Sequence, residues 1–116
     1  MDKGSYILLI KLPEEKELEI GSLGVFEFEP GLYFYVGSGM NGLDKRVGRH
    51  LSDDKKKHWH IDYLLDEAEV VATVKFRTKE RIECDLSNIV SEIADEIPVA
   101  GFGSSDCPCK THLFKI

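Results

Sequence analysis

The sequence predicts an α+β fold: a small, mainly antiparallel β-sheet flanked by helices. Three observations lead to this prediction. Runs rich in β-branched and aromatic residues recur along the chain, segments of helical periodicity separate the later runs, and short polar loops connect them. With 116 residues the chain has the usual length of one domain, so we expect a single domain over residues 1–116.

The first half of the chain predicts two strands with an extra β-excursion between them. The nearly continuous apolar run YILLIKL at 6–12 reads as a buried strand that Pro13 ends. Apolar and acidic residues then alternate, with turn residues at 21–22 and 30–31, which predicts an inserted hairpin at about 13–30 with one solvated face. The run LYFYVGS at 32–38 predicts the next strand.

The second half alternates helices with strands. Leu43, Val47 and Leu51 recur at helical spacing, which predicts a helix with a narrow apolar face and a basic circumference. The segment HWHIDYLLDEA at 58–68 predicts a short amphipathic helix, and EVVATVKFR at 69–77 predicts a third strand. A short apolar strand is expected at the C-terminus.

A longer helix is predicted over residues 78–97. Thr78 is the expected N-cap, because its side-chain oxygen can accept a hydrogen bond from the first turn, and Pro98 ends the segment. The expected core stripe of this helix is Ile82, Leu86, Ile89, Ile93 and Ile97.

The charge of the chain is unevenly distributed. The net charge is −6, yet residues 44–60 hold six Lys or Arg against three Asp, a net +3, so the remainder carries −9. His50, His58 and His60 fall in the same basic segment. Such a run forms either a solvated face or a surface for an anionic partner.

The cysteines and the N-terminus indicate a cytoplasmic protein. Three cysteines are an odd number, which argues against a disulfide framework in a domain large enough to have a core. The first ten residues carry Asp2 and Lys3 and lack a signal-peptide pattern, and no apolar run approaches the roughly 18 residues of a membrane-spanning helix. We therefore expect reduced thiols, a cytoplasmic location and no membrane partner.

Four motifs occur in an informative order: GSY at 4–6, YVGS at 35–38, KRVGRH at 45–50, and a glutamate on a later helix. In this pattern the chain resembles the GIY-YIG nuclease superfamily, and most closely its small, mainly archaeal, single-domain branch, which is sometimes fused to a DNA glycosylase. The superfamily pattern covers about residues 4–97, while HWHIDYLL and the tail GFGSSDCPCKTHLF match the branch. The first half-motif departs from the pattern, with Ser5 where isoleucine is usual.

The resemblance implies a metal-dependent nuclease that hydrolyses phosphodiester bonds, acting in DNA processing or repair. The implied catalytic residues are Tyr6, Tyr35, Arg46, His50 and Glu83. Glu83 would hold one Mg²⁺ or Mn²⁺ ion, with Glu80 as the alternative, and Arg46 would bind phosphate through its planar guanidinium fork. Tyr6 would act as general base once neighbouring cations lower its pKa, with Tyr35 or His50 orienting or relaying the proton.

The expected partner is nucleic acid, DNA in preference to RNA, and a DNA-repair protein is a second expected partner. Glycines at the strand end would let a phosphate backbone approach closely, and the basic segment would supply cations. The expected nucleic-acid-binding residues are Gly37, Ser38, Lys45, Arg49, Lys55, Lys56, Lys57, His58 and His60.

Two alternatives stay open. One is a nucleic-acid-binding module that keeps the fold without catalysis, which the acidic balance and the inserted hairpin favour. The other is a small interaction domain stabilised by structural zinc, since two thiols and an imidazole fall within six residues of the tail and a further thiol lies on the long helix. The candidate zinc ligands are Cys84, Cys107, Cys109 and His112.

Overall fold

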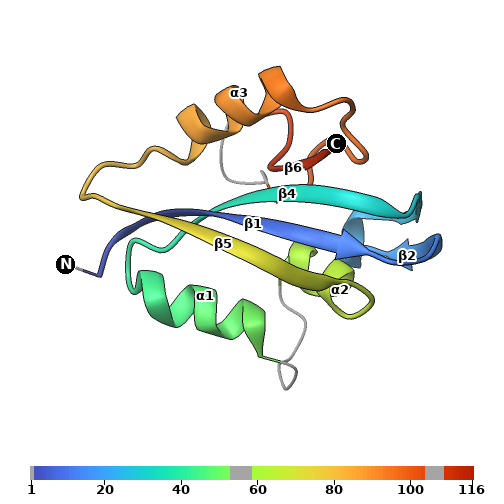
Figure 1. Ribbon diagram of the computed structural model, residues 1–116, viewed down its shortest axis with the longest axis horizontal. Coiled ribbons are helices and arrows are strands. Elements are labelled where there is room, and N and C mark those ends of the chain that lie inside the picture. The colour runs from blue at the N-terminus through green and yellow to red at the C-terminus, as the bar shows by residue number, and fades with distance from the viewer. Residues whose placement is uncertain (1, 53–58, 104–108) are drawn as a thin grey trace.

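A four-stranded antiparallel sheet forms the middle layer of the molecule (Figure 1). The computed structural model describes residues 2–52, 59–103 and 109–116. The strands are β1 (Gly4–Leu12), β4 (Gly31–Ser38), β5 (Glu69–Arg77) and β6 (Leu113–Lys115), in the order β5-β1-β4-β6. Each neighbouring pair runs antiparallel, which confirms the predicted α+β class with a mainly antiparallel sheet.

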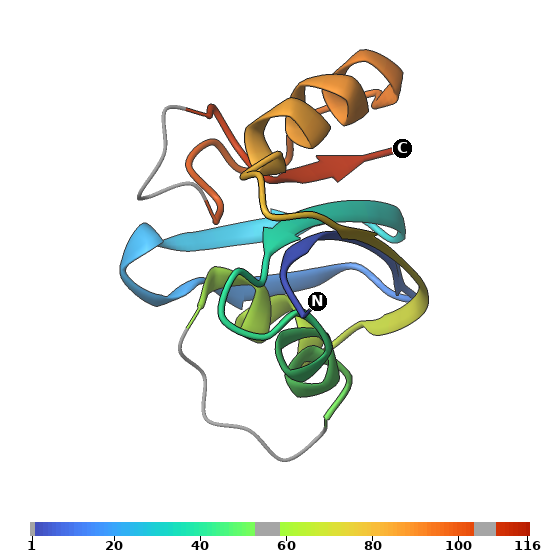
Figure 2. The same cartoon turned by 90° about the vertical axis from the view of Figure 1, so that its left-hand side faces the viewer.

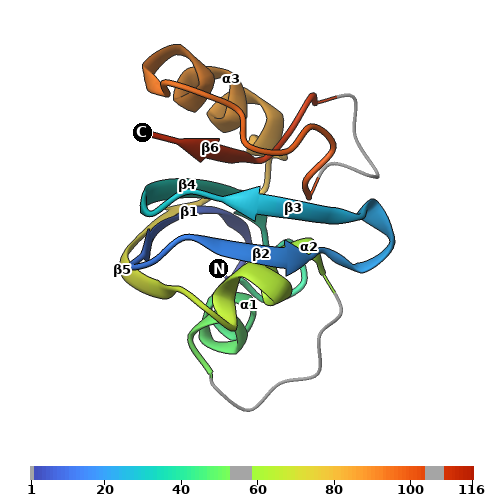
Figure 3. The ribbon, with the colours of Figure 1, turned by 90° about the vertical axis from the view of Figure 1, so that its right-hand side faces the viewer.

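The predicted excursion is a separate two-stranded sheet. Strand β2 (Lys16–Glu19) pairs with β3 (Val25–Phe28) around a short 3₁₀ turn, η1 (Gly21–Leu23). Ile20 and Phe28 are the fully buried apolar side chains of this hairpin, and both belong to the main hydrophobic core. The hairpin lies beside helix α2 (His60–Leu65), as Figure 3 shows.

The helices cover both faces of the sheet. Helices α1 (Leu43–Leu51) and α2 lie on one side, and α3 (Glu83–Ile93) lies on the other with β6 beneath it (Figure 2). The larger hydrophobic cluster joins the sheet to α1, α2 and the hairpin, and a smaller one lies under α3. No helix in the described part of the chain is long and apolar enough to cross a membrane.

Helix α1 buries a different face from the predicted one. Leu43 and Val47 are buried as expected, but Leu51 is 54% exposed and His50 takes the third buried position. At 3.6 residues per turn, His50 lies about 20° from the direction of Leu43, whereas Leu51 lies about 80° away on the other side. The expectation for Leu51 was therefore wrong, and a histidine completes the face that meets the sheet.

Helix α3 begins later than predicted. The hydroxyl oxygen of Thr78 accepts a hydrogen bond from the N–H of Glu80, which makes a local turn five residues before the helix starts at Glu83. The N-cap position is Ile82, and no side chain caps it. Thr78 therefore stabilises the loop after β5 and not the helix. A threonine hydroxyl can serve in either structure, so the sequence alone did not distinguish the two roles.

The core face of α3 is also rotated from the predicted stripe. Leu86 and Val90 are buried, but the expected core residues Ile89, Ile93 and Ile97 are 60%, 64% and 37% exposed. Ser87, one residue beyond Leu86, is buried against the C-terminal segment. The buried face is therefore centred between Leu86 and Ser87, which turns Ile89 toward solvent.

Candidate active site

An open pocket of about 360 Å³ lies where β1, β4, α1, α2 and the start of α3 approach one another. All five residues expected to carry catalysis line it, although they are spread over 78 positions of the sequence. No lining residue comes from the hairpin at 13–30, so in the described structure this insertion does not cover the pocket. The lining residues are Tyr6, Tyr35, Ser38, Met40, Asn41, Arg46, His50, Trp59, His60, Arg81, Glu83 and Gly103.

Tyr6 and Tyr35 share one face of the sheet. Tyr6 lies opposite Gly37 in the antiparallel register and Tyr35 lies opposite Leu8, so the two tyrosines are diagonal neighbours. Their ring centroids are 6.5 Å apart and both side chains are buried. Strand pairing alone therefore brings the two half-motifs of the sequence pattern together.

Gly37 has a packing role that the sequence did not suggest. A Cβ atom at this position would lie 2.3 Å from both Cζ and Oη of Tyr6, far inside van der Waals contact. The missing side chain thus makes room for the Tyr6 ring. The structure explains Gly37 through this ring, whereas the sequence-based expectation explained it through a phosphate.

A short hydrogen bond links Tyr6 to His50. The Tyr6 Oη and His50 Nε2 atoms are 2.6 Å apart, and both side chains are buried. In the tautomer that carries its proton on Nδ1, His50 accepts the phenolic proton at Nε2. His50 reaches this position because it completes the buried face of α1.

Both pocket tyrosines are held in their neutral form. Burial raises the pKa of Tyr6 well above its usual value, an increase that the neighbouring Arg46 charge opposes and the Glu83 carboxylate reinforces. Burial likewise raises the pKa of Tyr35, with smaller contributions from Tyr6 and Glu83. The expected lowering of the Tyr6 pKa is therefore not what the protein groups alone produce, because loss of solvent outweighs the guanidinium.

Arg46 is fixed against the pocket wall. Its Nη1 atom donates to the carbonyl oxygen of Ser38 at 2.8 Å, at the end of β4. Its Cζ lies 4.4 Å from the centroid of the Trp59 ring, within cation–π range. A guanidinium held on two sides is oriented before any ligand arrives.

Arg49 has a structural role beside the site. Its two terminal nitrogens donate to the two carboxylate oxygens of Asp62 at 2.9 and 3.0 Å, and the Asp62 side chain is fully buried. Asp62 also accepts from the N–H of Trp59 at 2.9 Å, and Arg49 Cζ lies 4.3 Å from the Trp59 ring centroid. Arg49 therefore ties α1 to α2, and it does not line the pocket.

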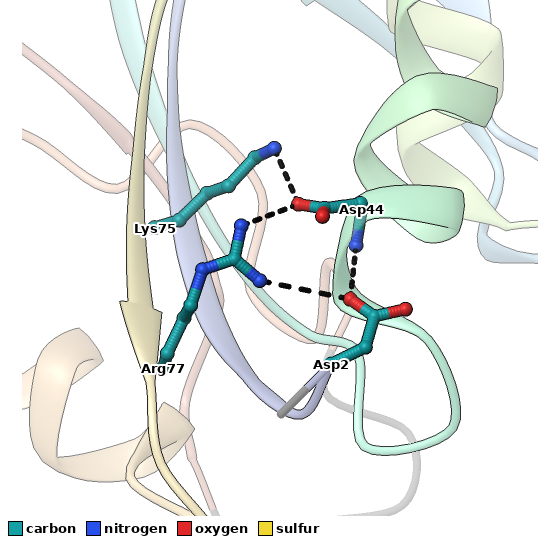
Figure 4. A network of polar contacts seen from close by, with 4 residues as sticks. All are labelled: Asp2, Asp44, Lys75 and Arg77. Atoms are coloured by element: carbon teal, nitrogen blue, oxygen red, sulfur yellow. Dashed lines mark hydrogen bonds and ion pairs between the residues drawn. The ribbon is translucent and has the colours of Figure 1, made fainter.

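A surface network anchors the first turn of α1 to strand β5 (Figure 4). One carboxylate oxygen of Asp44 accepts from Lys75 Nζ at 2.7 Å and from Arg77 Nη2 at 2.8 Å. These two hydrogen bonds lower the pKa of Asp44. Asp2 accepts from the Asp44 N–H at 2.9 Å and lies 3.7 Å from Arg77. The network helps to set where α1 begins, and hence where Arg46 lies.

Glu83 is the carboxylate that faces the pocket. It opens α3, its side chain is 24% exposed, and its Oε1 lies 3.7 Å from His112 Nε2. No other carboxylate lines the pocket among the described residues, and the alternative, Glu80, is exposed outside it. Magnesium is commonly bound by one or two carboxylates together with waters and phosphates, so this donor set fits a single Mg²⁺ or Mn²⁺.

Comparison with known proteins identifies the family of the chain. The family model described as "Domain of unknown function DUF123" matches residues 5–116. The chain belongs to the DUF123 family. The matched span includes the hairpin at 13–30 and the C-terminal segment, so both are part of the family's domain. No curated protein and no solved structure matched the chain.

The residues expected to bind nucleic acid are only partly gathered at the pocket of this DUF123 domain. Ser38 and His60 line it, whereas Lys45 is exposed on α1 outside it. Nδ1 of His60 accepts from the N–H of Gly103 at 2.9 Å, and burial lowers the His60 pKa. Gly37 and Arg49 do not line the pocket either. The remaining four expected residues lie outside the described part of the chain: Lys55, Lys56, Lys57 and His58.

Five lining residues of the DUF123 pocket were not predicted from the sequence: Met40, Asn41, Trp59, Arg81 and Gly103. Trp59 had a signal, since a lone tryptophan in a basic segment can stack on guanidinium groups. Gly103 had none, because its place beside Tyr35 depends on the path of the C-terminal segment. Its φ of +70° is a conformation that favours glycine.

Proposed function

We propose that this DUF123 domain is a metal-dependent nuclease of the GIY-YIG type that hydrolyses phosphodiester bonds of DNA in cytoplasmic DNA processing or repair. One observation supports this most strongly. Tyr6, Tyr35, Arg46 and Glu83, which match the superfamily motifs, come from four different elements and line one pocket together with His50. A packing role for each residue separately would not require them to share a cavity.

The Tyr6–His50 pair supplies the path for the proton of the attacking water. Because burial keeps the Tyr6 hydroxyl protonated, Tyr6 accepts the water proton as its own proton passes to His50 Nε2. The resulting hydroxide attacks phosphorus, and the bond from phosphorus to the leaving oxygen breaks. The leaving oxygen takes a proton from solvent, and His50 later returns its proton through Tyr6.

Arg46 and Glu83 carry the charge of the reaction. The guanidinium of Arg46, oriented by Ser38 and Trp59, stabilises the negative charge that grows on the phosphate oxygens. Glu83 would hold the Mg²⁺ or Mn²⁺ ion, which supplies Lewis-acid polarisation of the phosphate when bound. Tyr35 packs at 6.2 Å from the His50 ring and so keeps the imidazole facing Tyr6.

A second candidate is a nucleic-acid-binding module with the same fold and no catalysis. The raised pKa of Tyr6 favours it, because the Tyr6 hydroxyl can take a proton from water only if His50 accepts the hydroxyl's own proton at the same time. The two candidates differ in one observable. A binding module retains DNA without converting it.

The deciding experiment incubates the protein with branched, nicked and plain duplex DNA, and with matched RNA, in Mg²⁺, Mn²⁺ or a chelator. We expect metal-dependent cleavage of at least one DNA, and its loss in Arg46→Ala. Lys11→Ala is the control, since it removes an exposed cation of β1 that neither lines the pocket nor belongs to the residues expected to bind nucleic acid. Retention of DNA with no cleavage in either metal would favour the binding module.

A further inference from the structure

A second cluster of metal-ligating side chains lies at the start of α3. Cys84 comes from the first turn of this helix, and Cys109 and His112 come from the segment that leads into β6. One ligand atom of each residue lies within 4.8 Å of the others. We propose that these three residues bind a Zn²⁺ ion that joins α3 to the C-terminal segment.

The spacing of the three ligand atoms is close to that of a zinc site. Zinc bonds of about 2.3 Å to sulfur and 2.0–2.1 Å to nitrogen place tetrahedral ligands about 3.5–3.8 Å apart. Side-chain rotations that move the ligand atoms by about 1 Å would therefore bring all three to bonding distance from one ion. The two cysteines and the histidine come from segments 25 residues apart, so proximity is a product of the fold and not of local sequence.

His112 is oriented as metal-ligating histidines commonly are. Its side chain is fully buried, and its Nδ1 lies 2.5 Å from the hydroxyl oxygen of Ser87 on α3. A hydrogen bond from one ring nitrogen fixes the tautomer and assigns coordination to the other. Nε2 is then the coordinating atom, and Ser87 is its supporting partner.

The chemistry of the cluster selects its ion. Two thiolates and an imidazole suit zinc, whereas magnesium requires oxygen ligands. The site is therefore distinct from the one proposed at Glu83, although Glu83 precedes Cys84 directly and lies 3.7 Å from His112. Cys107, grouped with these residues in the sequence, lies outside the described residues. A zinc at Cys84 would hold the first turn of α3, and so fix the backbone of Glu83 at the pocket.

Metal content tests the proposal directly. Untagged protein, dialysed against micromolar Zn²⁺ and then buffer, should retain close to one zinc per chain by elemental analysis. Cys84→Ser and Cys109→Ser should each lose most of it, while Ser91→Ala, an exposed change on the same helix, should retain it. Little zinc in the wild type, or full zinc in both cysteine variants, would overturn the site.

A second readout needs no variant and so remains decisive if a cysteine variant fails to fold. Wild-type protein loaded with Co²⁺ should show thiolate charge-transfer absorption and the visible bands of tetrahedral cobalt, and their absence would contradict the proposal. Chelation should lower the melting temperature, since metal binding adds to folding stability. These measurements use no nucleic acid, and Glu83→Gln should keep its zinc, so their outcome is independent of the proposed nuclease activity.

Discussion

The hydroxyl of Tyr6 and Nε2 of His50 are 2.6 Å apart, although 44 positions separate the two residues in the chain. Strand β1 presents Tyr6 to the pocket, and the buried face of α1 presents His50 to Tyr6. The pair connects the packing of the domain with its proposed chemistry, because the same contact closes the core and offers a route for a proton.

The first prediction concerns this pair. Tyr6→Phe and His50→Gln should each lower the cleavage rate about 10²–10⁴-fold, the usual contribution of general acid–base catalysis. Since both act on one proton, the double variant should be little slower than either single one. Single-turnover rates at saturating protein measure this. Multiplicative losses in the double variant would show that the two residues act separately.

The second prediction concerns alkaline stability. Burial raises the pKa of Tyr6 and Tyr35, and that of Tyr33 to about 12, so the folded state holds these protons more tightly than the unfolded chain. Their contribution to stability is complete below pH 10, the usual tyrosine pKa, and falls as the pH rises toward 12 and beyond. Urea unfolding between pH 8 and 11.5 should show a falling midpoint above pH 10. Tyr6→Phe should flatten that fall, and an unchanged slope would contradict the assignment.

The third prediction separates the two arginines of α1. Arg46→Ala should abolish cleavage with little change in melting temperature, because a partly exposed arginine contributes only about 0–1 kcal/mol through its contacts. Arg46→Lys should not restore the rate, since one ammonium cannot reproduce the bidentate fork. A large drop in melting temperature for Arg46→Ala would instead show that Arg46 has a structural role.

Arg49→Ala should behave in the opposite way. It leaves the fully buried Asp62 carboxylate without its bidentate partner, and breaking such a pair costs up to about 3–5 kcal/mol. Thermal unfolding should show the loss, and Asp62→Asn in the Arg49→Ala background should recover part of it by removing the buried charge. DNA binding by Arg49→Ala should be measured at a temperature where the variant is still folded, so that loss of fold is not mistaken for loss of binding.

The fourth prediction compares two glycines. Gly37→Ala places a methyl group 2.3 Å from the Tyr6 ring, so it should displace the ring, destabilise the fold and lower activity. Gly48→Ala, on the exposed side of α1 where the new Cβ meets nothing within 4 Å beyond the local backbone of its own helix, should stabilise by about 0.5–1 kcal/mol. Chemical denaturation measures both. Equal effects would mean that Gly37 does not accommodate Tyr6.

The strands were predictable because their signal is local. The run at 69–77 is β5 without a shift at either end, and 6–12 and 32–38 fall within one or two residues of β1 and β4. The helix faces were less predictable. Adjacent apolar stripes have similar periodicity, and a buried polar residue selects between them: His50 displaces Leu51 on α1, and Ser87 turns Ile89 outward on α3.

The candidate site was likewise predictable in part. Tyr6, Tyr35 and Arg46 were predictable by resemblance to known motifs, and the sheet register then places the tyrosines together. The bond between Arg49 and Asp62 was not, because neither residue carries a pattern that names a partner thirteen positions away. Long-range polar pairs of this kind depend on how α1 and α2 pack, which the sequence does not display.

The most direct test of the nuclease proposal is the Mg²⁺ dependence of DNA cleavage in Glu83→Gln beside Glu80→Gln. Glu83 lines the pocket and Glu80 is exposed outside it, so the pair is matched in charge and chemistry. We predict that Glu83→Gln binds the DNA but does not cleave it at any Mg²⁺ concentration, while Glu80→Gln cleaves as the wild type does. Wild-type cleavage retained in Glu83→Gln, or a wild type that cleaves no DNA in Mg²⁺ or Mn²⁺, would contradict the proposal.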